Sequence, residues 1–139
     1  MVIRILWSLL AIGLLAFAVF ESIKYGWVVG GVVIAFAVLP DIALIAAFDP
    51  ARKGMLRPER VVLYNICHLP WLPVALLVVG ALAPLPQLGG VDGGTVMFVA
   101  GLAWLLHIAT DRAFGYGLRD ADGAVKRVGG LGAPGLCQA

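Results

Sequence analysis

The sequence predicts an all-α integral membrane protein built as a bundle of four transmembrane helices. Three observations lead to this prediction: the composition, four apolar stretches of membrane-spanning length, and the uneven placement of basic residues. Hydrophobic residues make up 62% of the 139 positions, and the mean hydropathy is +1.01. Charged residues make up 13%, whereas a soluble domain has about 25%. A soluble domain of this length would lack the polar side chains to cover its surface, and two cysteines are too few for a secreted disulfide scaffold.

The apolar stretches lie at about residues 3–20, 27–48, 61–82 and 95–114. Each is near the length of about 20 residues at which a helix crosses a bilayer, and helix is expected because lipid offers no hydrogen-bond partner to an open strand edge. Residues 16–18 have the small-x-small form of a signal-peptide end, but they lie inside the apolar run, so we expect the first helix to be retained. Residues 1–118 are expected to form the transmembrane domain, and residues 119–139 a flexible, Gly-rich cytoplasmic tail.

Glycine and proline mark the expected turns and breaks of these helices. A tight turn at Gly26 joins the first two helices into a hairpin. Pro40 interrupts the second helix and leaves the carbonyl of Phe36 without its usual donor. The third helix contains two prolines, of which Pro70 is the first, and is expected to kink just past His68. Such breaks are tolerated where the backbone lines a cavity or is packed in protein.

Basic residues predict the orientation. Of the ten Lys and Arg residues, only Lys24 falls on the side of the 83–94 loop. The other side holds Arg4, Arg52, Lys53, Arg57, Arg60, Arg112, Arg119, Lys126 and Arg127. Because basic residues near span ends stay in the cytoplasm, both termini are expected to be cytoplasmic. The basic residues thus determine topology, and the expected partner is the lipid bilayer rather than a nucleic acid.

Rare ionisable side chains inside the spans are the candidate functional residues, because each costs about 2.5–3.5 kcal/mol on insertion scales. Asp41 and His107 each lie seven residues before the cytoplasmic end of a span, and His68 lies seven residues after one. At the helical rise, all three are expected about 10 Å deep in the same leaflet. Asp111 follows His107 at i+4 and shares its helix face. We therefore expect these side chains to meet in one layer.

A set of two imidazoles and two carboxylates suits zinc, iron or manganese. The candidate metal ligands are accordingly Asp41, His68, His107 and Asp111. The pattern does not designate a catalytic residue or a residue that binds an organic cofactor. The same side chains could instead form interhelical hydrogen bonds, which are common in membrane bundles, or a proton or ion relay.

Four neighbouring residues are expected to support this site. Asn65 precedes His68 by three residues and is a candidate outer-layer or weak ligand, and Tyr64 lies one turn before His68. Arg112 is expected to extend to the membrane interface rather than to bind phosphate. Tyr116 is expected in the aromatic belt at headgroup level.

Three functions remain open from these residues, and whether the protein is an enzyme is undecided. The first is a metal-dependent hydrolase that acts on a lipid or phosphoester at the cytoplasmic leaflet. The second is a structural or partner-binding membrane protein in which the polar layer sets helix register. The third is a small transporter or proton relay, which would require a homo-oligomer because four helices are few for a transporter.

Three motifs carry a family resemblance: Pro40-Asp41, the segment from Tyr64 to His68, and the segment from His107 to Arg119. They resemble the P-D, Y-N-x-x-H and H-x-x-x-D-R-x-x-G-Y-G-L-[KR] signatures of domain of unknown function family 4260, in the same order and at similar spacing. The resemblance covers about residues 4–119. It implies a small four-helix integral protein of the bacterial inner membrane, and it implies no activity. The motif types are also similar, by analogy only, to membrane-bound metal-dependent hydrolases.

Overall fold

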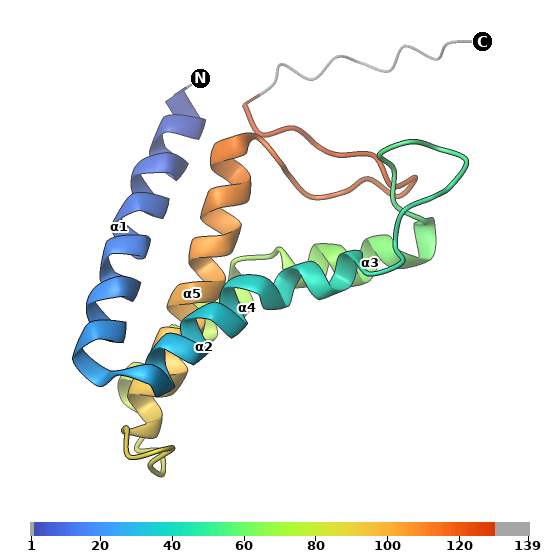
Figure 1. Ribbon diagram of the computed structural model, residues 1–139. Helices are drawn as coiled ribbons and strands as arrows, with labels where there is room; N and C mark the ends of the chain where they lie inside the picture. Colours follow the sequence, from blue (N-terminus) through green and yellow to red (C-terminus); the bar gives the residue numbers. More distant parts are fainter. Residues whose placement is uncertain (1, 130–139) are drawn as a thin grey trace.

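The computed structural model describes residues 2–129, which Figure 1 shows as helices joined by loops. The elements are α1 (Val2–Tyr25), α2 (Trp27–Val38), the 3-10 helix η1 (Leu39–Leu44), α3 (Pro58–Cys67), α4 (Trp71–Leu82) and α5 (Gly93–Phe114). The helices long and apolar enough to cross a membrane are Val2–Tyr25, Trp27–Leu44, Pro58–Leu82 and Gly93–Phe114. Within the described residues, the predicted all-α chain with four such helices is confirmed.

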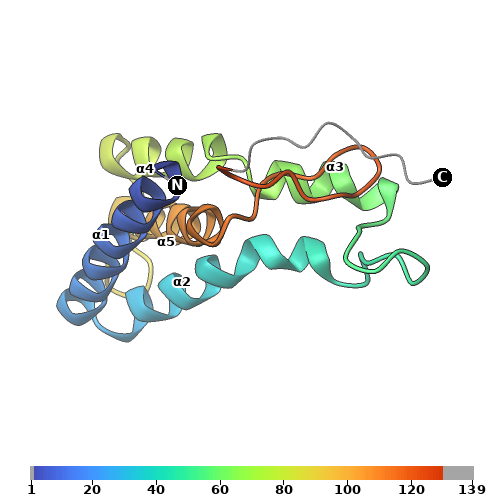
Figure 2. The same ribbon diagram turned by 90° about the horizontal axis from the view of Figure 1, so that it is seen from above.

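The central helix is α5, which packs against α1, α2 and α4. Figure 2 shows it between a row formed by α4 and α3 and a row formed by α2 and η1. Half of the most apolar 18-residue stretch of α5 is buried, against 6% in α1. Ile12 of α1, for example, is 65% exposed. The outer helices thus keep large apolar faces uncovered, which suggests a multi-pass membrane protein.

Glycines bring α4 and α5 together at backbone distance. A Cβ atom at Gly101 would lie 2.6 Å from the carbonyl oxygen of Pro73, and one at Gly94 would lie 2.7 Å from that of Gly80. Small residues permit this kind of approach between apolar helices, which gain van der Waals contact from it. The glycines therefore determine how closely α5 lies against α4.

The second and third long helices are broken at the prolines, as the sequence predicts. The α-helical geometry of α2 gives way to the 3-10 helix η1, with Pro40 in its first turn. The third helix stops at Cys67 and resumes at Trp71 as α4. Gly26 turns the chain between α1 and α2 with a φ of 76°. A 3-10 turn and a helix break each leave backbone carbonyls free for other donors.

Residues 119–129 form a hairpin that packs against the loop before α3. The N–H of Leu56 donates to the carbonyl of Gly123 at 3.1 Å, and Gly123 turns the hairpin with a φ of 93°. The sequence predicts a flexible tail here, because the segment is polar and rich in glycine. The structure differs, because these glycines serve turns and close contacts with residues far away in the sequence. The rest of that tail, 130–139, lies outside the described residues.

Candidate metal centre

Four side chains from three parts of the chain meet between η1, the α3–α4 break and α5. The Nε2 atoms of His68 and His107 lie 3.4 Å apart. Asp111 Oδ2 lies 3.4 Å from Nε2 of His68 and 3.7 Å from that of His107. Asp41 Oδ1 lies 3.9 Å and 3.6 Å from the same two atoms. The structure thus brings together all four candidate metal ligands.

The spacing of these donor atoms suits a small tetrahedral ion. Ligands of zinc at bond lengths of about 2.0–2.2 Å are separated from one another by about 3.3–3.6 Å. The two imidazoles and the Asp111 carboxylate fall close to that range at 3.4–3.7 Å. The separation of 3.9 Å between His68 and Asp41 is the longest of the five distances. The donor atoms of Asp41, His68 and His107 lie within 4.8 Å of one another and could hold a metal ion, and Asp111 lies within 3.7 Å of both imidazoles.

Backbone carbonyls determine which nitrogen of each imidazole faces the centre. His68 Nδ1 donates to the carbonyl of Tyr64 at 2.9 Å, and His107 Nδ1 donates to that of Ala37 at 2.8 Å. A carbonyl oxygen only accepts, so both Nδ1 atoms carry a proton. In the neutral imidazoles both Nε2 lone pairs then point at the centre, as metal-ligating histidines require.

The Ala37 carbonyl is free for His107 because of Pro40. In a 3-10 helix the N–H of residue 40 would donate to the carbonyl of residue 37, and proline has no N–H. The sequence predicts that Pro40 frees the carbonyl of Phe36, which is correct for an α-helix. Because the helix tightens at Leu39, the relevant carbonyl is shifted by one residue to Ala37.

The centre is rich in acceptors and lacks a cationic partner. Two carboxylates and two Nε2 atoms face one another, and His68 is fully buried. Within residues 2–129, no Lys or Arg forms an ion pair with Asp41 or Asp111. Such a cluster needs positive charge, either a metal ion or protons on the imidazoles. Two negative charges match one divalent cation.

Access to the centre is one-sided. The exposed fractions of the side chains are 48% for Asp41, 24% for Asp111, 11% for His107 and zero for His68. The His68 side is closed by protein, and the Asp41 side is open. Structural zinc sites are closed, whereas catalytic ones keep a position for water or substrate.

Tyr64 packs directly on the buried imidazole. Its ring lies 3.9 Å from that of His68, centroid to centroid, with 19° between the planes. The guanidinium of Arg119 also lies over the Tyr64 ring, with Cζ 5.3 Å from the ring centroid. This stack restrains the orientation of His68. The charge pattern of the sequence predicts only a role in topology for Arg119, whereas its position at the end of the third motif is the signal for a role at the site.

Asn65 serves a different purpose from the one predicted. Its amide pairs with the backbone of Arg119, donating from Nδ2 to the carbonyl at 3.0 Å and accepting from the N–H at Oδ1 at 2.8 Å. Because Asn65 lies three residues before His68, its side chain leaves the helix at an angle of about 60° around the axis from that of His68. That rotation directs its amide at the hairpin, so Asn65 anchors residues 119–129 to α3.

Arg112 also differs from its prediction. Its side chain is 9% exposed, and it donates to the carbonyls of His68 at 3.2 Å and Tyr116 at 2.8 Å. The helix break after His68 leaves that carbonyl available, and a buried guanidinium needs acceptors. Arg112 therefore ties the C-terminal end of α5 to the break instead of extending to an interface. The Tyr116 side chain is half exposed.

A family model described as Domain of unknown function (DUF4260) matches residues 5–127. The matched range contains the four metal-ligand candidates, the stack on His68 and most of the hairpin. No curated protein and no solved structure matches the chain.

Proposed function

The chain belongs to the family Domain of unknown function (DUF4260), and since that name assigns no activity, we propose a function from the geometry of the metal centre. The protein is a multi-pass membrane protein that binds one divalent transition-metal ion and hydrolyses an ester presented at the membrane surface. Zinc is the first candidate, before iron and manganese, because the donor spacing suits tetrahedral coordination by imidazole and carboxylate.

One observation carries the proposal. Two Nε2 atoms from separate helices lie 3.4 Å apart with carboxylate oxygens of Asp41 and Asp111 within 3.9 Å, and no Lys or Arg of the described chain is ion-paired with either acid. Interhelical hydrogen bonding alone would place donors against acceptors. With neutral imidazoles, acceptors face acceptors here, and a divalent cation would bind the two Nε2 atoms and the Asp111 carboxylate and balance the charge of Asp41.

Membrane insertion is supported by the apolar surfaces of the long helices. Leu9 is 61% exposed, Ile12 65% and Leu82 79%, and a soluble monomer rarely leaves such a continuous apolar surface in water. The basic residues gather at the end of the helices that holds the 49–60 loop and the hairpin. By the positive-inside rule that end lies in the cytoplasm, with both termini.

The unequal exposure of the two carboxylates assigns them different roles. Asp111, with His68 and His107, completes a three-ligand set of the kind that catalytic zinc sites use. A zinc ion held by these residues would make a water molecule acidic enough to give up a proton near neutral pH, and its charge would stabilise the transition state. Asp41, on the open side, is placed to accept that proton as the water oxygen attacks the ester, and to return it to the departing alcohol.

The experiment measures the metal content of the full-length protein, purified in detergent, by elemental mass spectrometry. We expect close to one zinc, iron or manganese per chain, and loss of that metal in the His68→Ala and Asp111→Asn variants. Glu59→Gln is the matched control, because Glu59 is an exposed acid in the first turn of α3. Circular dichroism of each variant reports whether it is folded.

Metal content and stability together separate this function from the structural one. If the polar layer only sets helix register, the wild-type protein should contain no more metal than a sample of Glu59→Gln from which metal has been removed with a chelator. His107→Leu should then lower the melting temperature without changing the amount of bound metal. That result would overturn the proposal. Metal-dependent hydrolysis of a lipid phosphoester in vesicles, abolished in Asp41→Asn, would establish the catalytic part.

A further inference from the structure

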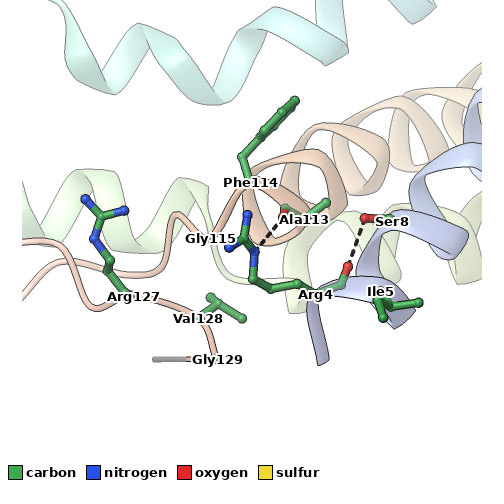
Figure 3. Close-up of a pocket in the computed structure, with 9 residues that line it drawn as sticks. All are labelled: Arg4, Ile5, Ser8, Ala113, Phe114, Gly115, Arg127, Val128 and Gly129. Carbon is green, nitrogen blue, oxygen red and sulfur yellow. Dashed lines mark hydrogen bonds between the residues drawn. The ribbon is translucent and has the colours of Figure 1, made fainter. Parts of the chain in front are cut away.

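A polar cavity lies away from the metal donors, at the junction of the first turns of α1, the end of α5 and the end of the hairpin. Its volume is about 500 Å³, and its lining includes Arg4, Phe114 and Arg127. Figure 3 shows Arg4 projecting from α1 beside Gly115, and Arg127 projecting from the hairpin. Among residues 2–129, the lining contains two guanidinium groups and no carboxylate.

Arg4 is held in place while most of its guanidinium stays free. Its Nε donates to the carbonyl of Ala113 at 2.9 Å, one of the last four carbonyls of α5, which have no partner within the helix. Among the described residues, neither terminal nitrogen of Arg4 has a hydrogen-bond partner. Gly115 ends α5 beside this arginine with a φ of 92°, a left-handed conformation that favours glycine.

The hairpin brings Arg127 to the same cavity. The N–H of Val128 donates to the carbonyl of Gly115 at 3.1 Å. Gly129 then passes α1 so closely that a Cβ would lie 2.9 Å from Cγ2 of Ile3. Within residues 2–129, the Arg127 side chain makes no ion pair or hydrogen bond. Two arginines separated by more than one hundred positions in the sequence therefore line one cavity, and no described residue supplies a counter-charge.

These charges and their surroundings indicate the ligand. The planar fork of arginine matches phosphate oxygens, so two unpaired guanidinium groups favour a phosphate. The rim is apolar: Ile5 is 51% exposed and Phe114 66%, and the uncovered apolar face of α1 continues from it. An amphiphile with a phosphate head and an acyl chain fits both features. We propose that this cavity binds the headgroup phosphate of an anionic phospholipid whose acyl chain lies along α1.

The test uses full-length protein purified in detergent, freed of bound lipid by washing, and titrated with phosphatidylglycerol or phosphatidylcholine. Native mass spectrometry measures the fraction of protein that carries lipid. We expect tighter binding of phosphatidylglycerol, and weakening of that binding by about fivefold in each of Arg4→Gln and Arg127→Gln. Arg57→Gln, which removes an exposed arginine elsewhere, should bind as the wild type does. Equal binding of both lipids, or an equal loss in Arg57→Gln, would overturn the proposal.

A competition arm separates lipid from free phosphate. Inorganic phosphate in large excess should leave the phosphatidylglycerol adduct intact, because it lacks the acyl chain that contacts α1. Complete displacement would assign the cavity to a soluble phosphate compound and overturn the lipid assignment. The proposal shares the membrane location with the proposed function but does not depend on the metal. Bound metal measured in Arg4→Gln should match the wild type, so each proposal can fail alone.

Discussion

Replacing Asn65 by leucine is expected to release the hairpin from α3. The substitution keeps the shape of the side chain but removes both hydrogen bonds to the backbone of Arg119, at 2.8 Å and 3.0 Å. Arg119 is 9% exposed, so water replaces these partners poorly. At about 1 kcal/mol for each hydrogen bond, docking of the hairpin should weaken by about 2 kcal/mol. The opening equilibrium of the hairpin should then rise by about 30-fold.

The assay for this prediction is amide hydrogen exchange of the full chain in detergent, resolved by residue. The N–H of Arg119 should lose protection, and so should that of Leu56, which donates to the carbonyl of Gly123 in the hairpin. Trypsin should also cut faster after Lys126, because its backbone N–H bonds to Leu118 only while the hairpin is closed. Amides in the middle of α5 report global stability and should change little.

Unchanged exchange at Arg119 in Asn65→Leu would refute the reasoning, because it would mean that the amide of Asn65 contributes nothing to docking. Equal loss of protection in α5 would refute it differently, by showing that the substitution unfolds the whole protein. Glu59→Gln on the same helix serves as the control. Because Arg119 covers Tyr64, which stacks on His68, we also expect Asn65→Leu to bind metal more weakly.

Three other substitutions test separate parts of the structure. Pro40→Ala supplies an N–H that competes for the carbonyl bonded by His107, so metal affinity measured against a chromophoric chelator should fall by about tenfold or more. Gly101→Ala places a Cβ 2.6 Å from a carbonyl oxygen, and thermal unfolding should show a loss of about 1–3 kcal/mol. The hydrogen bond from Arg52 holds the pKa of Asp49 below its ordinary value. The stability that this hydrogen bond adds should be present at neutral pH and should be lost as the pH falls through the lowered pKa of Asp49. Acid unfolding curves of Arg52→Gln should show a smaller loss of stability over that pH range.

The hairpin and the metal centre depend on one another through a short chain of contacts. Asn65 holds the backbone of Arg119, whose guanidinium also donates to the carbonyls of Gly54 and Gly123 at 2.8 Å and 3.1 Å. The same guanidinium covers Tyr64, and Tyr64 restrains His68. Second-layer contacts of this kind orient metal-binding histidines and commonly affect metal affinity by 10- to 100-fold. The hairpin therefore belongs to the support of the site, although it contributes no donor atom.

Local chemistry determined the helices and the depth of the polar residues. Apolar stretches near 20 residues define spans because hydrocarbon thickness and helical rise are both constant. The same constant rise placed Asp41, His68 and His107 at one depth, and the structure brings their donor atoms within 4.8 Å of one another. Proline and glycine mark breaks through their own backbone chemistry, so Pro40, Pro70 and Gly26 needed no tertiary information.

Only the tertiary structure decided which partner each free backbone group receives. The Ala37 carbonyl meets His107 from 70 positions away, and Asn65 meets Arg119 from 54. Arg112 binds the carbonyl of His68 across 44 positions. A sequence shows that a proline or a helix end leaves an acceptor without a donor, but packing decides which donor arrives. For this reason the sequence predicts the four metal-ligand candidates but not the contacts that orient them.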